Sequence, residues 1–311
     1  MKYTRRAFLL TTAALVGANP DPAAKSLPLR LSMWTNEGTP VAAKDLAVNI
    51  DGVKAKLNRL GTPADPLLLH VVLDLVGDLT LVDPAREALI AEINKTTALV
   101  SLLRAQDGLR VLRDPGTSKV NLEETLRGMA IVGRAGLLDT IAPAAALSDA
   151  VLRGARVRSA VLFVTDSVIT NYREDYTNPV VNSSDANDMS RRFPEGLIKE
   201  KVRQIKEELA TTLSPVFIVH LNFLHDRLNE AYQTGLLDLA NATGGAAEFC
   251  RTSSDIPVQI ERAFARLSTL QVADIEVRPG RKPHPLKIAM TGQGSPLQYR
   301  PSYMPVMKDG K

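Results

Sequence analysis

The sequence predicts an α/β fold, with an open, mostly parallel, doubly wound sheet, one antiparallel edge strand, and small β elements at both ends of the chain. Continuous apolar runs at 67–74 and 159–166 are typical of strands that are buried on both faces. Helical patterns alternate with such strands along the middle of the chain, which indicates a parallel sheet. The turn Gln106-Asp107-Gly108, between apolar runs at 98–103 and 109–112, adds an antiparallel hairpin.

The chain begins with a segment that looks like a twin-arginine export signal, over residues 1–18. Arg5-Arg6 precede a short apolar stretch and then small residues. We therefore expect an exported protein, periplasmic or extracellular; the alternative is a cytosolic N-terminal helix. Residues 19–66 are expected to form a linker and then a β segment, with Asp51-Gly52 as a hairpin turn. Its strands are predicted over 27–34, 46–50 and 53–60.

Composition excludes several classes of function. The chain has 311 residues and a formal charge of +4, three units of which come from basic residues of the leader. No stripe of Lys and Arg with interleaved aromatics occurs, so the sequence does not support nucleic-acid binding. No later segment is long and apolar enough to span a membrane. Cys250 is the only cysteine, which excludes an internal disulfide and favours a buried thiol.

Residues 67–270 are predicted to form the main domain. The first helix is expected to begin at Asp83-Pro84, with Asp83 as N-cap and Pro84 in the first helical position. Thr243-Gly244-Gly245 is expected to end a helix and turn into a strand. The remaining predicted helices cover 121–133, 141–152, 195–211, 226–242 and 255–270, and the remaining strands cover 216–220 and 246–250.

Two further segments complete the prediction. Residues 167–194 form a long polar loop that leaves the carboxyl edge of a buried strand, where long loops often carry recognition; plain disorder is the alternative. Residues 271–311 are predicted to form a β-hairpin, over 272–277 and 286–290, followed by a polar tail. Because 28–60 and 271–290 flank the main domain, we expect them to pack together.

Several stretches in this order resemble the von Willebrand factor type A domain, and more narrowly the bacterial "VWFA-related" family of exported proteins. Val71-Val72-Leu73-Asp74 resembles the first core strand of that domain. Val161 to Asp166 resembles the strand that ends in Thr-Asp. The other matching stretches are 31–60, 98–110, 237–245 and Asp255-Ile256-Pro257, so that the resemblance covers most of residues 28–290.

The resemblance implies a metal-ion-dependent adhesion site at the carboxyl edge of the sheet. The family's first motif, Asp-x-Ser-x-Ser, here reads Asp74-Leu75-Val76-Gly77-Asp78, so that Val76 and Asp78 replace the two serines. The family's threonine would fall at Ala145, and Thr140 is the only nearby substitute. The third motif's aspartate matches Asp166.

This residue set leaves two interpretations open. Asp74, Asp78 and Asp166 could hold one Mg²⁺ or Ca²⁺ together with waters, because these ions prefer several oxygen ligands. Without a metal, clustered carboxylates would raise one another's pKa. Asp78 could instead cap the helix that begins nearby. We expect a degenerate, metal-free site, since Val76 cannot ligate a metal.

The resemblance implies a non-enzymatic module that binds a protein partner at the carboxyl edge of the sheet. The sequence lacks Gly-x-Ser-x-Gly and a glycine-rich phosphate loop, and Val76 stands where a haloacid dehalogenase-type phosphatase has its second aspartate. A metal-dependent exported hydrolase and a metal-independent scaffold of an envelope or secretion assembly remain alternatives. The residues expected to contact a partner are Val76, Ala145, Tyr172, His220 and His225.

Overall fold

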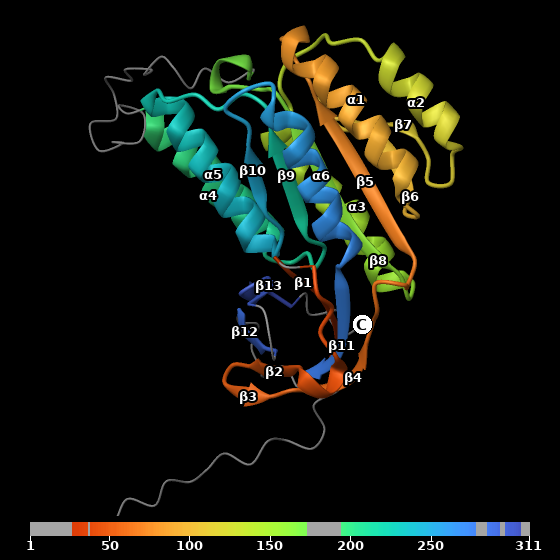
Figure 1. The fold of residues 1–311 in the computed structure, drawn as a ribbon. Helices are drawn as coiled ribbons and strands as arrows, with labels where there is room; N and C mark the ends of the chain where they lie inside the picture. The colour runs from red at the N-terminus through yellow and green to blue at the C-terminus, as the bar shows by residue number, and fades with distance from the viewer. Residues whose placement is uncertain (1–26, 37, 173–193, 278–284, 293–295, 306–311) are drawn as a thin grey trace, which may run out of the picture.

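The computed structural model describes residues 27–36, 38–172, 194–277, 285–292 and 296–305, which form an α/β domain with a smaller β module below it (Figure 1). The predicted export signal, 1–18, lies outside the described residues, as does most of the predicted recognition loop, 167–194. None of the described helices is long and apolar enough to cross a membrane.

A six-stranded sheet forms the centre of the α/β domain, and it confirms the predicted fold class. Its strand order is β10-β9-β8-β5-β6-β7, with parallel pairing except between β6 and β7. All eight residues of β5 and of β8 are buried, which explains their continuous apolar sequence. The strands are β5 (Leu67–Asp74), β6 (Leu99–Arg104), β7 (Arg110–Arg113), β8 (Arg158–Thr165), β9 (Val216–His220) and β10 (Ala247–Phe249).

Helices cover both faces of this sheet (Figure 1). One face packs against α1 (Leu79–Lys95) and α6 (Asp255–Ser268), and α2 (Lys119–Gly128) adds Leu122 and Leu126 to the same core. The other face packs against α3 (Leu137–Gly154), α4 (Pro194–Leu209) and α5 (Arg227–Thr243). The two apolar cores hold the sheet rigid, so that its strand ends are fixed positions on which a site can be built.

The start of α1 differs from the prediction. The helix begins at Leu79 and is capped by Asp78, whose Oδ1 accepts hydrogen bonds from Thr80 N at 2.9 Å and Thr80 Oγ1 at 2.6 Å. Asp83 lies inside the helix and forms an ion pair with Arg86. Pro84 lies in the second turn of the helix, where its missing N–H leaves the carbonyl oxygen of Thr80 without its helical donor. Asp78 is therefore the N-cap of α1, which is the role given above as the alternative to metal binding.

The β module consists of two small sheets that bury an apolar core between them. In one sheet, of order β13-β1-β11-β4, β1 (Leu27–Thr35) pairs antiparallel with β11 (Gln271–Val277). In the other, of order β14-β12-β2-β3, β2 (Ala47–Ile50) pairs antiparallel with β12 (Leu286–Thr291). Both pairings confirm that the segments flanking the domain pack together. The other strands are β3 (Val53–Lys54), β4 (Lys56–Leu60), β13 (Leu297–Tyr299) and β14 (Ser302–Tyr303).

The predicted C-terminal hairpin is wrong. The strands β11 and β12 belong to different sheets, because β11 already has β1 on one edge and β4 on the other. The tail after Thr291, predicted to be merely polar, contributes β13 and β14. By contrast, both predicted hairpin turns are present, and Asp51 with Gly52 and Asp107 with Gly108 all have positive φ.

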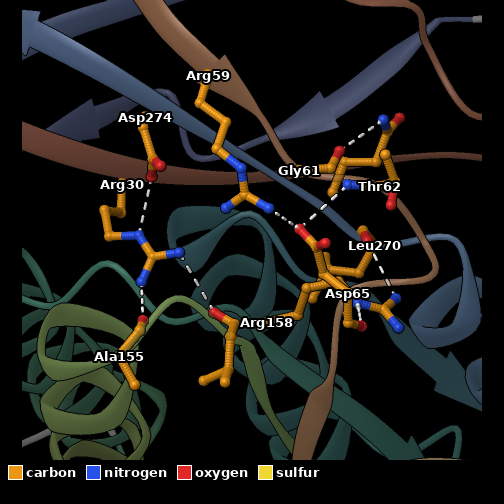
Figure 2. Close-up of polar contacts among 11 residues, drawn as sticks. Arg30, Arg59, Gly61, Thr62, Asp65, Ala155, Arg158, Leu270 and Asp274 are labelled. Carbon is orange, nitrogen blue, oxygen red and sulfur yellow. Dashed lines mark hydrogen bonds and ion pairs between the residues drawn. The ribbon is translucent and has the colours of Figure 1, made fainter.

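The buried Arg158 and the half-buried Arg30 join the β module to the amino edge of the large sheet (Figure 2). Arg158, the first residue of β8, donates to the carbonyl oxygens of Asp65 at 2.8 Å, Ser268 at 2.9 Å and Leu270 at 3.1 Å. Arg30 of β1 forms an ion pair with Asp274 and donates to carbonyls at the end of α3. These contacts cap helix C-termini with cations, which is a favourable arrangement.

Candidate functional site

The two aspartates that the sequence singled out lie side by side at the carboxyl edge of the large sheet. Asp74 is the last residue of β5, and Asp166 follows the last residue of β8. The strands are neighbours, with Asp74 opposite Thr165, so the prediction that both strand ends meet at one edge is confirmed. The side chains are nevertheless buried, with Asp74 0% and Asp166 4% exposed.

The Asp166 carboxylate is surrounded by backbone amides. Its Oδ1 accepts from Val76 N at 2.7 Å, and its Oδ2 accepts from Gly77 N and Asp78 N, each at 3.1 Å. Three consecutive N–H groups that converge on one anion form a nest, which stabilises negative charge. The loop after β5 is therefore folded around the side chain that the resemblance assigned to a metal.

The Asp74 carboxylate binds the start of α3. It accepts from Gly136 N at 2.9 Å, from Leu137 N at 3.2 Å and from Thr165 Oγ1 at 3.2 Å. Burial raises the pKa of this carboxyl group to about 6, although its hydrogen bonds act in the opposite direction. Two helix N-termini are thus held by carboxylates: Asp78 caps α1, and Asp74 accepts from the first amides of α3.

The other residues proposed from the adhesion-site motif lie away from this arrangement. Thr140 is buried within α3, and its hydroxyl donates to Gly136 O at 2.7 Å. Ala145 lies in the middle of α3 with 0% exposure, packed in the core, so the expectation that it contacts a partner is wrong. The residues of this segment that reach the edge are Gly136 and Leu137, at the N-terminus of the helix.

The arrangement does not fit a divalent cation. Within the part of the chain that the structure describes, no group of three or more His, Cys, Asp or Glu side chains is placed to hold an ion. The oxygens of Asp74 and Asp166 face N–H and O–H donors, and a cation would have to displace those donors. Asp78 turns its carboxylate to the N-terminus of its own helix instead.

A buried polar network that the sequence reading missed lies behind Asp74. Thr165 Oγ1 lies 2.6 Å from Ser167 Oγ, which lies 3.1 Å from Tyr232 OH. Tyr232 OH in turn lies 2.7 Å from Tyr172 OH. Burial raises the pKa of both tyrosines, so they remain neutral donors and acceptors. The residues of this network come from segments that are far apart in the sequence. The only sign of it in the sequence is a polar side chain, such as Tyr232, on an otherwise apolar helix face.

The histidines differ in their positions. His220 is 1% exposed, and its Nε2 lies 2.9 Å from the carbonyl oxygen of Ser167. Burial lowers the pKa of His220 to about 4, so the ring is neutral at pH 7. His220 and Tyr172 are therefore interior residues, and the expectation that their side chains contact a partner is wrong. His225 is exposed, and Val76 is half-buried.

Among the described residues, the outer surface of the edge carries polar, aromatic and apolar side chains. Gln233 fixes the loop after β9, because its side chain accepts from Leu224 N at 2.9 Å and donates to Leu224 O at 2.8 Å. This loop places Phe223 against His225, with ring centroids 4.9 Å apart, and the Arg251 guanidinium lies over Phe223. Leu79, 59% exposed, begins α1 next to the nest, and Val132, 61% exposed, lies in the segment between α2 and α3 that leads to Gly136. The loop held by Gln233 thus presents an aromatic and cationic surface at this edge.

Comparisons with known proteins give only distant similarities. No protein-family model matches the sequence, and no curated protein matches it significantly. The structure is similar to a von Willebrand factor type A protein from Catenulispora acidiphila, with 11% identity, a TM-score of 0.47, and coverage of 91% of this chain and 74% of that one. It is also similar to the PilB minor pilin from Streptococcus sanguinis, with 11% identity, a TM-score of 0.46, and coverage of 67% of this chain and 62% of the pilin chain. The structure is also similar to the SpRpn10 VWA domain, with 13% identity, a TM-score of 0.38, and coverage of 63% of this chain and 95% of that one. At such identities and TM-scores, these similarities assign no activity or partner.

Proposed function

We propose that this chain is an exported, non-enzymatic protein-binding module of the von Willebrand factor A type, and that its carboxyl edge binds a protein partner without a divalent metal. Export rests on the Arg5-Arg6 pattern of the leader. Binding at this edge rests on a general property of open α/β sheets, whose ligands bind beyond the carboxyl ends of the strands.

One observation carries the metal-free part of the proposal. The Asp166 carboxylate accepts hydrogen bonds from three backbone N–H groups of the loop 76–78. The Asp74 carboxylate accepts hydrogen bonds from the N–H groups of Gly136, the N-cap of α3, and of Leu137, its first residue. In this arrangement the carboxylates order the loops themselves, which is the role that an ion and its ligands would otherwise have. Loops that are ordered in advance bind at a lower entropic cost.

The metal-dependent hydrolase is the weaker alternative. Such an enzyme would need a cation that polarises its substrate or activates a water. Here the buried carboxylates face donors, and the neutral His220 is closed off from solvent. A scaffold of an envelope assembly differs from the proposed module only in the permanence of its partner, and the same surface would serve both.

Calorimetry tests the metal-free binding mode. Mg²⁺, Mn²⁺ and Ca²⁺ are titrated into the chelator-treated full chain, beside an Asp74→Ala variant. We expect no saturable heat with any of the three ions and no change in the melting temperature between chelator and added metal. Saturable heat that disappears in Asp74→Ala would overturn the metal-free proposal.

Site-specific photo-crosslinking tests the binding surface. A photoreactive residue replaces Leu79 or Val132 at the edge, and Val120 on α2, which is 65% exposed, serves as the matched control. In cells of the native host we expect a discrete crosslinked protein from the two edge positions, unaffected by chelator, and none from Val120. Equal crosslinking at all three positions would argue against a specific edge surface.

A further inference from the structure

A second candidate binding surface lies at the opposite end of the molecule, in the β module. A groove of about 470 Å³ runs between β2 and β4. Leu46 and Val48 of its floor are 8% and 2% exposed, and the half-buried Leu57 and Leu60 pack against the same core. In Figure 1 the strands β2 and β4, which line this groove, lie at the opposite end of the molecule from the carboxyl edge of the large sheet. A ligand in the groove would therefore not compete with one bound at that edge.

The backbone of one groove wall is an open sheet edge. In the order β13-β1-β11-β4, the strand β4 pairs with β11 on one side, and no described strand pairs with its other side. All five residues of β4 line the groove. An edge strand presents N–H and C=O groups that can pair with an added strand.

The charged side chains that line this groove are all cationic. Its lining includes Lys44, Lys54, Lys56 and Arg59 and contains no Asp or Glu. Arg59 forms an ion pair with Asp65 at 2.6 Å, whereas Lys56 lies 3.9 Å from Glu276 with 74% of its own side chain exposed. Within the described residues, Lys44 and Lys54 form no ion pair. The groove therefore has cationic charge to offer a ligand.

We propose that this groove binds an extended, acidic segment of a partner protein, which adds to β4 as a further strand. Pairing with β4 of a second copy is disfavoured, because Lys56 and Arg59 would meet like charges on the partner strand. The half-buried Leu57 and Leu60 offer apolar contact to alternate side chains of the added strand, whereas a nucleic acid or polysaccharide would make no use of that contact or of the strand edge.

The test uses the full chain and a short fluorescent peptide of alternating valine and glutamate, followed by anisotropy. Three comparison ligands accompany it: the same peptide with N-methylated glutamates, a valine–lysine peptide, and duplex DNA. N-methylation removes strand-pairing donors but keeps charge and side chains. Hydrogen exchange of residues 56–60 is measured with and without the acidic peptide.

We expect saturable binding of the acidic peptide, slower exchange in 56–60, and at least tenfold weaker binding of the N-methylated and lysine peptides. K44E/K54E should weaken binding about tenfold, equivalent to about 1.4 kcal/mol, whereas the matched control K199E/K206E on α4 should leave it unchanged. Absence of binding would overturn the proposal. So would equal binding of the N-methylated peptide, or of duplex DNA, without slower exchange, because charge alone would then suffice. The peptide comparisons need no variant, so misfolding of K44E/K54E would not obscure the result.

Discussion

The Asp166 side chain reaches across the carboxyl edge of the sheet, and its Oδ1 lies 2.7 Å from the backbone nitrogen of Val76. Val76 occupies the position of the first serine in the metal-site motif that the sequence resembles. Its side chain cannot ligate a metal, but its N–H is part of the nest around the aspartate. The residue without a hydroxyl and the internal use of the carboxylate thus meet at the same contact.

Asp166→Ala should destabilise the protein. The change removes a charged acceptor from three backbone N–H groups, and we expect the free energy of unfolding to fall by about 2–4 kcal/mol. Asp78→Ala, which removes only a helix cap, should cost about 1 kcal/mol. Urea denaturation of both variants checks the order. A smaller loss for Asp166→Ala than for Asp78→Ala would contradict the nest interpretation.

Asp74→Asn should change how stability depends on pH. The carboxyl pKa is raised from an ordinary value of 3.8 to about 6 in the folded state, so the folded state binds the proton more tightly than the unfolded state. Stability from this group is therefore fully present below pH 4 and is lost as pH rises through about 6, by about 3 kcal/mol. Relative to the wild type, Asp74→Asn should gain stability across that window, as measured by urea denaturation at a series of pH values.

A histidine variant gives the opposite sign and serves as the control. Burial lowers the pKa of His220 to about 4, so its contribution is present above pH 6.5 and is lost as pH falls through about 4. Relative to the wild type, His220→Gln should therefore gain stability as the pH falls from about 6.5 to about 4, as measured by the same urea denaturation series. If both variants gave difference curves of the same slope, the assignment of these pKa shifts would be wrong.

Arg158→Met should weaken the junction between the domain and the β module. Arg158 is 5% exposed and donates to several backbone carbonyls, including those of Asp65 and Leu270. Leaving these acceptors without a donor should cost about 2–4 kcal/mol. Arg59→Met removes a partly exposed ion pair and should cost less than about 1 kcal/mol. Chemical denaturation measures both, and equal losses would show that Arg158 is not the principal contact.

Gly235→Ala should reveal how closely α4 and α5 pack. A Cβ at this position would lie 2.5 Å from Val202 Cγ2. We expect a loss of about 1–3 kcal/mol from overpacking, although alanine in a helix is otherwise favoured over glycine by about 1 kcal/mol. In a Val202→Ala background the same change should become neutral or stabilising. A double-mutant cycle measures this coupling, and additive effects would contradict the predicted clash.

The parts of the fold that the sequence predicted best are those that local pattern determines. The strand Val216–His220 was predicted with its observed bounds, because a short apolar run between turn signals has few alternatives. The hairpin turn Asp51-Gly52 was equally clear. Helix starts were less certain where two caps compete, as Asp78 and Asp83 do within a few residues, and only tertiary packing decides between them.

The parts that sequence could not predict depend on partners that are far away along the chain. The strands β11 and β12 look like a hairpin because they are adjacent in sequence. Their packing with the N-terminal segment is predicted, but not that each pairs with a strand of that segment instead of with the other. The candidate site shows the same limit. Asp74 and Asp166 were found from strand ends, whereas their amide partners Gly136 and Val76 carry no side-chain signal at all.

The pairing of Leu60 with Ala273 has a consequence for how the protein is made, because it joins positions on either side of the entire α/β domain. During synthesis β1 and β4 emerge long before β11, the strand between them, exists. Once the domain between them has folded, its two ends lie close together, so that less entropy is lost in closing the remaining loop. The β module can therefore be completed only after the whole α/β domain has been synthesised.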